Sequence, residues 1–400
     1  MPEVVIVSAC RTPIGRFGGG LRSLKAVDLG AIVIREALRR AGLRGEDVDY
    51  VFMGQVVTAG CGQVPSRQAA IKAGVPATTP SVTVNKVCCS GIKAIDLAVQ
   101  MIQAGRASIC VAGGMESMSN CPYGLPEMRW GARMGIPGRQ VLDLMVYDGL
   151  WCSFYNRHMA IHGSEVAKEF GISREDQDRW AYHSQMRAKA AMEAGRLRDE
   201  IVPVEILGTK GEVKVVDADE QPRPDTTLEA LAKLSPVFDP SGTVTAGNAP
   251  GVNDGAAAVV VMSRDKAEEL GIEPLCTVLG YAEVSQDPKY IATVPGLSIQ
   301  KLLEQTQYSL TAMDLIEINE AFAAVTLVSG NKILGLSQED MHARVNVNGG
   351  AVAFGHPIGA TGARIVMTLA YELRRRGGGL GVCGICSGAA QGDAMLIKVE

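Results

Sequence analysis

The chain has 400 residues, of which 47% are hydrophobic and 20% are charged, and its formal net charge is −4 at pH 7. This length suits roughly two or three packed units, and the composition is that of a globular α/β protein. The negative charge argues against a nucleic-acid surface, and apolar runs such as residues 255–262 are far shorter than a membrane span. We therefore expect neither a nucleic acid nor a membrane as a partner.

The start of the chain and its cysteine content both suggest a reducing compartment. Residues 4–7 read Val-Val-Ile-Val, and no basic flank, apolar stretch and cleavage site indicate a secretory signal. Ten cysteines in 400 residues are too sparse for a disulfide scaffold. We expect a cytoplasmic protein whose thiols stay free.

Short β-branched runs alternate with amphipathic stretches through the first 120 residues. Strands are expected at 4–7, 48–52, 82–84 and 109–112, and helices at 29–41 and 92–102. We expect Asp28 to cap the first helix and Gly42 to end it. The alternation predicts helices packed on a sheet in a βαβ arrangement.

The same alternation returns near the end of the chain. Strands are expected at 315–318, 345–347 and 394–399, starting from Leu275, with a helix at 363–373. The order and spacing of these segments match those of the first part, which favours duplication of one αβ half. A chance likeness between αβ units is the alternative.

Residues 121–250 differ in character from both halves. They contain charged and proline-rich clusters at 217–220 and 221–224 and a charged helix predicted at 174–194, where Ser173 and Asp176 form a capping box. We interpret this region as an inserted domain that holds the long tail of a substrate. The predicted division is a first half at 1–120, completed by about 251–273, and a second half at 274–400.

A pair of cysteines follows a predicted strand within residues 84–91, Val-Asn-Lys-Val-Cys-Cys-Ser-Gly. A helical pattern begins near Ser90, so Cys88 lies at a helix amino terminus. The helix dipole and the free N–H groups there favour a thiolate over a thiol. We expect Cys88 to be a nucleophile, and an inert buried cysteine is the alternative.

A glycine-rich loop at residues 348–362 contains His356, one of five histidines in the chain. Many glycines suit a backbone that must approach another group closely. An imidazole in such a loop can activate a thiol or donate to a developing oxyanion. The alternative is a structural histidine that caps a turn.

Residues 381–392 form a strand-like run with Cys383 and Cys386, broken by small residues. In a duplicated fold this turn would lie beside the first helix start, so a thiolate at Cys386 could act as a base opposite Cys88. The Cys-x-x-Cys spacing also occurs in zinc sites and redox pairs. The chain has no second such pair, and we expect no metal.

Asn319 begins the run Asn-Glu-Ala-Phe-Ala at residues 319–323, where a predicted strand meets a helix. A side-chain amide at such a junction can hold a water or an oxyanion. An ordinary helix cap is the alternative.

Four of these segments together resemble the active-site segments of the thiolase family. They are Asn-Lys-Val-Cys-Cys-Ser-Gly at 85–91, Asn-Glu-Ala-Phe-Ala at 319–323, Gly-His-Pro-Ile-Gly-Ala-Thr-Gly at 355–362 and Cys-Ser-Gly-Ala-Ala-Gln-Gly at 386–392. The resemblance covers nearly the whole chain. It implies an α/β thiolase fold, with two duplicated βαβαβαββ halves in a five-layer αβαβα sandwich and an inserted loop domain. It also implies a homotetramer, a dimer of dimers, with contacts near residues 120–140.

The resemblance implies a role for each candidate residue. Cys88 would carry the acyl group, and His356 would take its proton and share an oxyanion hole with a water held by Asn319. Cys386 would remove an α-proton from a second acetyl-CoA. The backbone N–H groups of Cys88 and Gly388 would form a second oxyanion hole. The activity implied is acetyl-CoA C-acetyltransferase, with acetyl-CoA, acetoacetyl-CoA and CoA as ligands and no further cofactor.

For coenzyme A, the resemblance points to His158, Arg223 and Phe238 in the inserted domain and its return. The guanidinium of Arg223 suits the nucleotide phosphates because it offers fixed paired donors. Pro250 stands where many members carry a serine that contacts CoA, and Ile291 replaces a methionine near the acyl pocket.

Three other functions remain open at this point. One is a 3-ketoacyl-CoA thiolase of broader chain length. Another is a decarboxylating ketoacyl synthase, a related class that lacks the second catalytic cysteine, so Cys386 argues against it. The third is a CoA-thioester-binding scaffold without chemistry, which the complete catalytic set disfavours.

Overall fold

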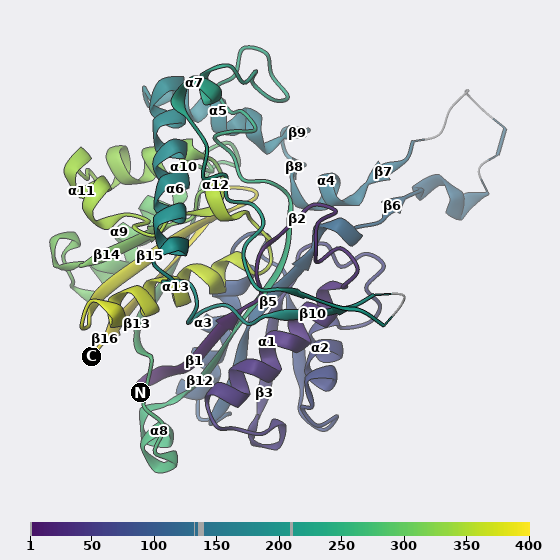
Figure 1. Cartoon of the computed structure of the whole chain (residues 1–400), viewed down its shortest axis with the longest axis vertical. Coiled ribbons are helices and arrows are strands. Elements are labelled where there is room, and N and C mark those ends of the chain that lie inside the picture. Colours follow the sequence, from purple (N-terminus) through teal and green to yellow (C-terminus); the bar gives the residue numbers. More distant parts are fainter. Residues whose placement is uncertain (1, 132, 135–139, 209–210) are drawn as a thin grey trace.

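Two sets of strands with one shared topology form the framework of the protein (Figure 1). The computed structural model describes residues 2–131, 133–134, 140–208 and 211–400. The first set consists of β1 (Val4–Arg11), β3 (Tyr50–Gly54), β4 (Ser81–Val84), β5 (Ile109–Ser117) and β12 (Asn253–Ser263). The second consists of β13 (Cys276–Ser285), β14 (Leu315–Ile318), β15 (Gly379–Ser387) and β16 (Gln391–Val399).

The strand pairings of the two sets are equivalent. In the first set β3 is parallel to β4 and β5, and β12 is antiparallel to β5 and β1. In the second set β14 is parallel to β15. A parallel bridge from Ile316 to Val345 joins β14 to the segment around Val345 on its other side. There β16 is antiparallel to β15 and β13. This equivalence confirms the duplication, and an antiparallel pairing of β1 with β13 joins the two sheets.

Helices on both faces of the sheets give the five-layer arrangement that the resemblance in the sequence implied. They are α1 (Ala26–Arg40), α2 (Pro65–Ala73) and α8 (Arg264–Leu270) in the first half with α3 (Ser90–Gln103), and α9 (Val294–Thr306), α10 (Ala323–Leu327), α11 (Gln338–Arg344), α12 (Ala351–Phe354) and α13 (Thr361–Arg375) in the second. The helices α3 and α13 pack on each other between the sheets, while α1 and α9 cover the outer faces. Short helical turns lie at Gly45–Asp47, Met118–Asn120, Pro126–Trp130 and Leu310–Ala312, and the π-helical turn η5 at Val328–Ile333.

Glycines in β5 let the central layer come close to the first sheet. A Cβ added at Gly114 would lie 1.9 Å from the carbonyl oxygen of Gly359, in the loop that follows His356. No side chain fits in that space, so the strand can carry only glycine there. This contact fixes the histidine loop against the strand ends of the first half.

Two details of the predicted elements differ from the structure. The first helix begins after Lys25, and Asp28 accepts from the Lys25 N–H at 3.1 Å, so it caps the helix from the third helical position rather than the first. The predicted strand at 345–347 is reduced to one bridge. Asn346 adopts a φ of +48°, and its side-chain amide pairs with the backbone of Ile318 at 2.8 Å in both directions, in place of a ladder.

The inserted segment forms small hairpins and helices over the top of the sheets. Its elements are β6 (Tyr123–Gly124), β7 (Leu142–Asp143), α4 (Leu144–Gly149), β8 (Trp151–Cys152), β9 (Arg157–His158), α5 (Met159–Glu169), α6 (Arg174–Glu193), β10 (Val204–Leu207), β11 (Val213–Val216) and α7 (Leu228–Ala232). The two-residue strand β2 (Gly15–Arg16) pairs with β12. The capping box of Ser173 and Asp176 at the start of α6 is confirmed.

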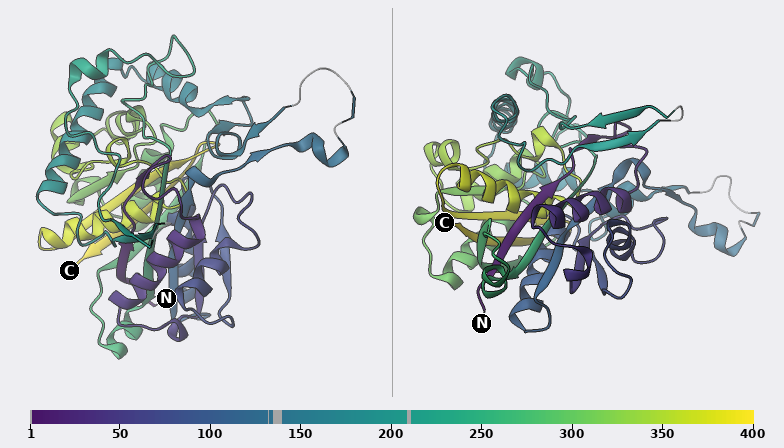
Figure 2. Two further views of the ribbon diagram at one scale, coloured as in Figure 1. Left: turned by 45° about the vertical axis from the view of Figure 1, so that its right-hand side comes forward. Right: turned by 60° about the horizontal axis from the view of Figure 1, so that its bottom comes forward.

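One part of the inserted segment reaches away from the body of the protein. Figures 1 and 2 show β6, β7 and the turn Pro126–Trp130 extending into solvent in every view. Large apolar side chains on this arm are exposed, including Tyr123, Met128 and Trp130 at 68%, 57% and 82%. Among the described residues, no helix is both long and apolar enough to cross a membrane.

Candidate active site

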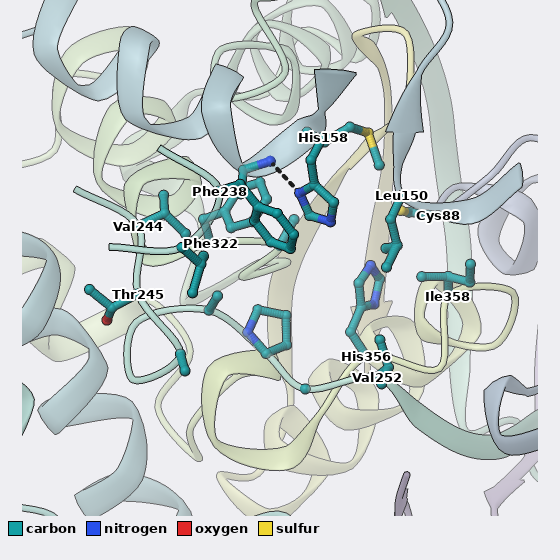
Figure 3. Close-up of a pocket in the computed structure, with 18 of the residues that line it drawn as sticks. Cys88, Leu150, His158, Phe238, Val244, Thr245, Val252, Phe322, His356 and Ile358 are labelled. Atoms are coloured by element: carbon teal, nitrogen blue, oxygen red, sulfur yellow. Dashed lines mark hydrogen bonds between the residues drawn. The ribbon is translucent and has the colours of Figure 1, made fainter. Parts of the chain in front are cut away.

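A mostly apolar cavity of about 240 Å³ lies where the inserted segment meets the two halves (Figure 3). Cys88, His158, Phe238 and His356 line it together. The other lining residues come from all three parts of the chain: Met118, Leu150, Met159, Ala160, Val237, Val244, Thr245, Ala246, Ala249, Pro250, Gly251, Val252, Ile291, Ala321, Phe322 and Ile358. Figure 3 shows the rings of His158 and His356 in one cavity, with Cys88 beside them.

Cys88 lies in the turn between β4 and α3, and its local backbone is strained. The preceding residue, Val87, has a φ of +45°, which is rare for a β-branched residue and is typical of functional sites. Burial raises the pKa of Cys88 to about 12, although the backbone N–H groups of Gly388 and Cys88 hydrogen-bond to its sulfur and lower it. The expected resting thiolate is therefore wrong, because desolvation outweighs the donors at the helix start.

The end of β15 packs directly on this turn and brings Cys386 beside Cys88. Ser387 Oγ donates to the carbonyl oxygen of Lys86 at 2.7 Å, and Cys89 Sγ donates to that of Ile385 at 3.5 Å. Burial, followed by the negative charge of a Cys88 thiolate, raises the pKa of Cys386. The two thiols are thus electrostatic neighbours, although Cys386 is fully buried and does not line the cavity.

The two cysteines of the Cys-x-x-Cys run do not form a pair. They are three positions apart on β15, so their side chains point to opposite faces of the sheet. Cys383 packs in the core around α3 and α13, whereas Cys386 packs in the core on the other face. Within the described residues no group of three or more His, Cys, Asp or Glu side chains could hold a metal ion.

His356 is held by hydrogen bonds that define its ring orientation. Its Nδ1 lies 2.7 Å from Thr361 Oγ1, and that hydroxyl donates its only proton to the carbonyl oxygen of Pro357 at 3.0 Å. Thr361 must therefore accept from Nδ1–H, which leaves a lone pair on Nε2. Nε2 is buried and has no hydrogen-bond partner among the described residues. Burial, with a smaller effect of the Arg364 charge, lowers the pKa of His356 to about 3.

Asn319 follows β14 directly, and its side chain is 1% exposed. Its backbone N–H donates to the Gly384 carbonyl oxygen at 2.9 Å. Both polar atoms of the side-chain amide are buried and lack a partner within the described chain. Such an amide is costly unless a water or ligand satisfies it, so the residue fits a role in holding one. It does not itself line the cavity.

His158 and Phe238 form one wall of the cavity. Their rings are stacked, with centroids 3.7 Å apart and an interplanar angle of 12°. His158 Nδ1 accepts from the Ala160 N–H at 3.1 Å, so the proton of the neutral ring is on Nε2. Burial lowers the pKa of His158 to about 4. The pair offers an apolar stacking surface with one donor at its edge.

Arg223 differs from the other predicted CoA residues because it lies outside the cavity lining. It is exposed, and its backbone N–H donates to Gln185 Oε1 at 2.8 Å. Nearby, Gln221 lies against Gly251, a cavity-lining residue. The arginine is therefore on the surface, two residues from Gln221, rather than within the cavity. Pro250 and Ile291, the two departures noted in the sequence, both line the cavity.

Sequence reasoning assigned no role to three polar residues that hold the histidine loop. Asn253 Oδ1 accepts from the His356 N–H at 2.9 Å. Glu116 accepts from the backbone N–H groups of Val56, Val57 and Gly359 at 3.0–3.1 Å. The third is Thr361. Each of the three is a polar residue within a run of small or apolar residues in the sequence, and that pattern could have indicated a buried polar contact.

Comparison with known proteins identifies the family. The family model described as "Thiolase, N-terminal domain" matches residues 4–265, and the one described as "Thiolase, C-terminal domain" matches residues 272–399. Proteins named acetyl-CoA acetyltransferase are 50% identical in Cupriavidus necator over 398 residues, 100% of both chains, and 48% identical in Syntrophomonas wolfei over 396 residues, 99% of both chains. Another of that name from Escherichia coli K12 is 49% identical over 399 residues, 100% of this chain and 99% of the relative. The chain belongs to the thiolase family.

Proposed function

We propose that the protein is an acetyl-CoA C-acetyltransferase, which condenses two acetyl-CoA molecules to acetoacetyl-CoA and CoA and catalyses the reverse thiolysis. The observation that carries this proposal is the packing of the end of β15 on the Cys88 turn, where Ser387 Oγ donates to the Lys86 carbonyl oxygen at 2.7 Å and the buried thiol of Cys386 lies beside that of Cys88. Full-length relatives bear the name of this activity. The proposed chemistry needs CoA thioesters and no metal or other cofactor. A cytoplasmic location stays a prediction.

In the first half-reaction Cys88 attacks the thioester carbonyl of acetyl-CoA. Its pKa of about 12 means that a base must take the thiol proton during attack, and the lone pair on His356 Nε2 suits that role. The S–C bond to Cys88 forms, the C–S bond to CoA breaks, and the proton passes from His356 to the leaving CoA thiolate. The N–H groups of Cys88 and Gly388, which already contact the sulfur, are placed to stabilise the carbonyl oxyanion.

In the second half-reaction Cys386 removes an α-proton from another acetyl-CoA. The enolate oxygen accepts from a water on the amide of Asn319, and His356 shares this oxyanion hole only when its Nε2 carries a proton. The carbanion then attacks the acetyl group on Cys88, forming the C–C bond and breaking the C–S bond to Cys88, whose sulfur takes the proton from Cys386. While Cys88 is acetylated its sulfur cannot ionise, so no Cys88 thiolate can form beside Cys386 and raise its pKa further.

The CoA moiety enters past the inserted segment. We propose that the stacked rings of His158 and Phe238 pack against its pantetheine arm. The exposed guanidinium of Arg223 pairs with the nucleotide phosphates outside the cavity. Pro250 supplies an apolar contact in place of a hydroxyl. The division into halves at 1–120 with 251–273 and at 274–400, around a CoA-binding insertion at 121–250, is part of this proposal.

We also propose a homotetramer built as a dimer of dimers. Its support is the exposed apolar arm, since large apolar side chains on a projecting segment are typical of contacts between subunits. The predicted contact segment, residues 120–140, falls partly outside the described residues, at 132 and 135–139. The described part carries Tyr123, Met128 and Trp130, all exposed.

The activity is tested by steady-state assays on the purified protein in both directions. We expect condensation of acetyl-CoA and CoA-dependent cleavage of acetoacetyl-CoA, with the rate falling as the 3-ketoacyl chain is lengthened. A maximum at longer chains would assign a broader 3-ketoacyl-CoA thiolase. Turnover that requires malonyl-CoA would assign a decarboxylating synthase, and CoA binding without acetylation of Cys88 would assign a scaffold.

The tautomer of His356 predicts an effect of Thr361. Replacing Thr361 with valine keeps the shape but removes the acceptor for Nδ1–H, so the ring can no longer be held with its lone pair on Nε2. We expect the rate of Cys88 acetylation to fall about 10–100-fold, as for other groups that orient a functional histidine. Thr361→Ser retains the hydroxyl and should keep a near wild-type rate. Rapid-quench mass spectrometry measures acetylation, and equal rates for the valine and serine variants would contradict the assignment.

A further inference from the structure

A second hollow, which shares no lining residue with the active-site cavity, lies between the inserted segment and the second half. Its volume is about 440 Å³. One wall is α6, which carries Arg179 and His183, and the opposite wall is formed by η5 and α11, which carry Lys332 and His342. We call this hollow the α6–α11 crevice.

The side chains of the crevice favour a negative ligand. The rings of His183 and His342 lie edge to face, with centroids 4.5 Å apart. Neither imidazole has a hydrogen-bond partner within the described chain, and the Lys332 ammonium has neither an ion pair nor a hydrogen bond there. Two cationic side chains and two imidazole N–H donors around one hollow form an arrangement that a phosphate group satisfies.

The crevice has little negative charge of its own. Asp176 is the one carboxylate among the described lining residues, and it already accepts from the Ser173 N–H and hydroxyl at 3.1 and 2.7 Å as part of the helix cap. Its contact with Arg179 is 3.5 Å long, between side chains 44% and 61% exposed, and such pairs contribute little. The crevice therefore keeps two permanent cations against one carboxylate that serves the helix.

The electrostatic state of His183 agrees with this balance. Its pKa is lowered by burial first and then by the charges of His342, Arg187 and Arg179. These neighbours act together as a positive environment in a chain whose net charge is −4. An anion placed between them would relieve that repulsion.

The floor of the crevice is connected to the active site. Trp180, which lines the crevice, donates from Nε1 to Glu320 Oε1 at 2.9 Å. Glu320 is the residue after Asn319, and it also accepts from Ser184 Oγ at 2.7 Å. A ligand on this floor would therefore lie against the segment that positions Asn319.

We propose that the α6–α11 crevice is a second ligand site, which binds a small phosphate-bearing anion through Arg179, Lys332 and the two imidazoles. The volume leaves room for a group attached to the phosphate. This site does not depend on the proposed function, because it uses none of the residues assigned to the reaction.

Isothermal titration calorimetry of the full-length protein in phosphate-free buffer tests the site, with inorganic phosphate and AMP as probes. We expect saturable binding with a Kd of about 1 mM or below. Lys332→Gln and Arg179→Gln should each raise the Kd at least about tenfold, since each removes a charge-assisted contact. Lys266→Gln, which removes a lysine paired with Glu269 on α8, is the matched control and should leave the Kd unchanged. Clear preference for AMP assigns a phosphomonoester, and equal affinity assigns the free anion.

Three results would overturn the proposal: no saturable heat with either probe, equal Kd values in all variants, or a rise in the KM for acetyl-CoA that parallels the loss of phosphate binding. The last would show that the anion occupies the acyl-CoA site. Because calorimetry needs no turnover, a protein that binds phosphate but lacks acetyltransferase activity would sink the proposed function and leave this site standing.

Discussion

Replacing Cys386 with alanine is expected to lower the rate of acetoacetyl-CoA formation by about 10²–10⁴-fold, the range lost when a positioned base is removed. Acetylation of Cys88 by acetyl-CoA should persist, because that step uses His356 and the N–H groups of Cys88 and Gly388. Intact-protein mass spectrometry after mixing with acetyl-CoA would show the trapped acetyl-enzyme.

Cys383→Ala is the matched control for this variant. Cys383 is also a fully buried cysteine of β15, but its side chain lies on the opposite face of the sheet. It should lose some stability and keep its condensation rate. If Cys386→Ala condensed acetyl-CoA at the rate of the control, the role of the second thiol as base would be refuted.

Replacing Asn319 with leucine is expected to have opposite effects on activity and stability. The side chains have similar size, but leucine cannot hold the water that completes the enolate oxyanion hole, so the condensation rate should fall about 10²–10³-fold. Burying an amide with no protein partner is unfavourable, so the free energy of unfolding should rise by about 1–2 kcal/mol. Steady-state kinetics and urea denaturation measure the two effects.

Thr326→Val separates the two effects of the asparagine change. Thr326 lies on α10, is fully buried, and its hydroxyl also lacks a partner among the described residues. Its replacement should stabilise the protein without changing turnover. A stable, fully active Asn319→Leu variant would show that the amide is not needed for catalysis, and a destabilised one would show that it is hydrogen-bonded in the folded protein.

The repeated topology could be read from the sequence because both halves alternate strands and helices in one order. Leu315–Ile318 was predicted with its observed bounds, since it is a short, largely apolar run that lies between the polar residues Asp314 and Asn319. The strand predicted at 345–347 was wrong, and the sequence could not have shown this. There the positive φ of Asn346 replaces backbone pairing with a side chain, and nothing in the local pattern signals that exchange.

The candidate site was predicted as a set of residue types, but its electrostatics were not. The position of Cys88 at a helix start suggested a lowered pKa, whereas burial in the folded protein raises it. That burial comes from segments distant in the sequence, such as β15, so the local pattern could not show it. The same is true of His356, whose orientation depends on Thr361 and Asn253. For Arg223 the sequence predicted a CoA contact but not its position, because a motif match cannot distinguish a residue that lines the cavity from one on the surface.

The contacts that seat the reactive turn also determine when the enzyme can first work. Lys86 pairs with Asp393 across 307 positions of sequence at 2.6 Å, so the nucleophile turn is completed only when β16 has docked on the first half. Loop closure over such a span is entropically slow. A partly folded chain therefore carries no assembled thiol pair until its two halves have docked, which makes the proposed activity a property of the completed fold and not of either half alone.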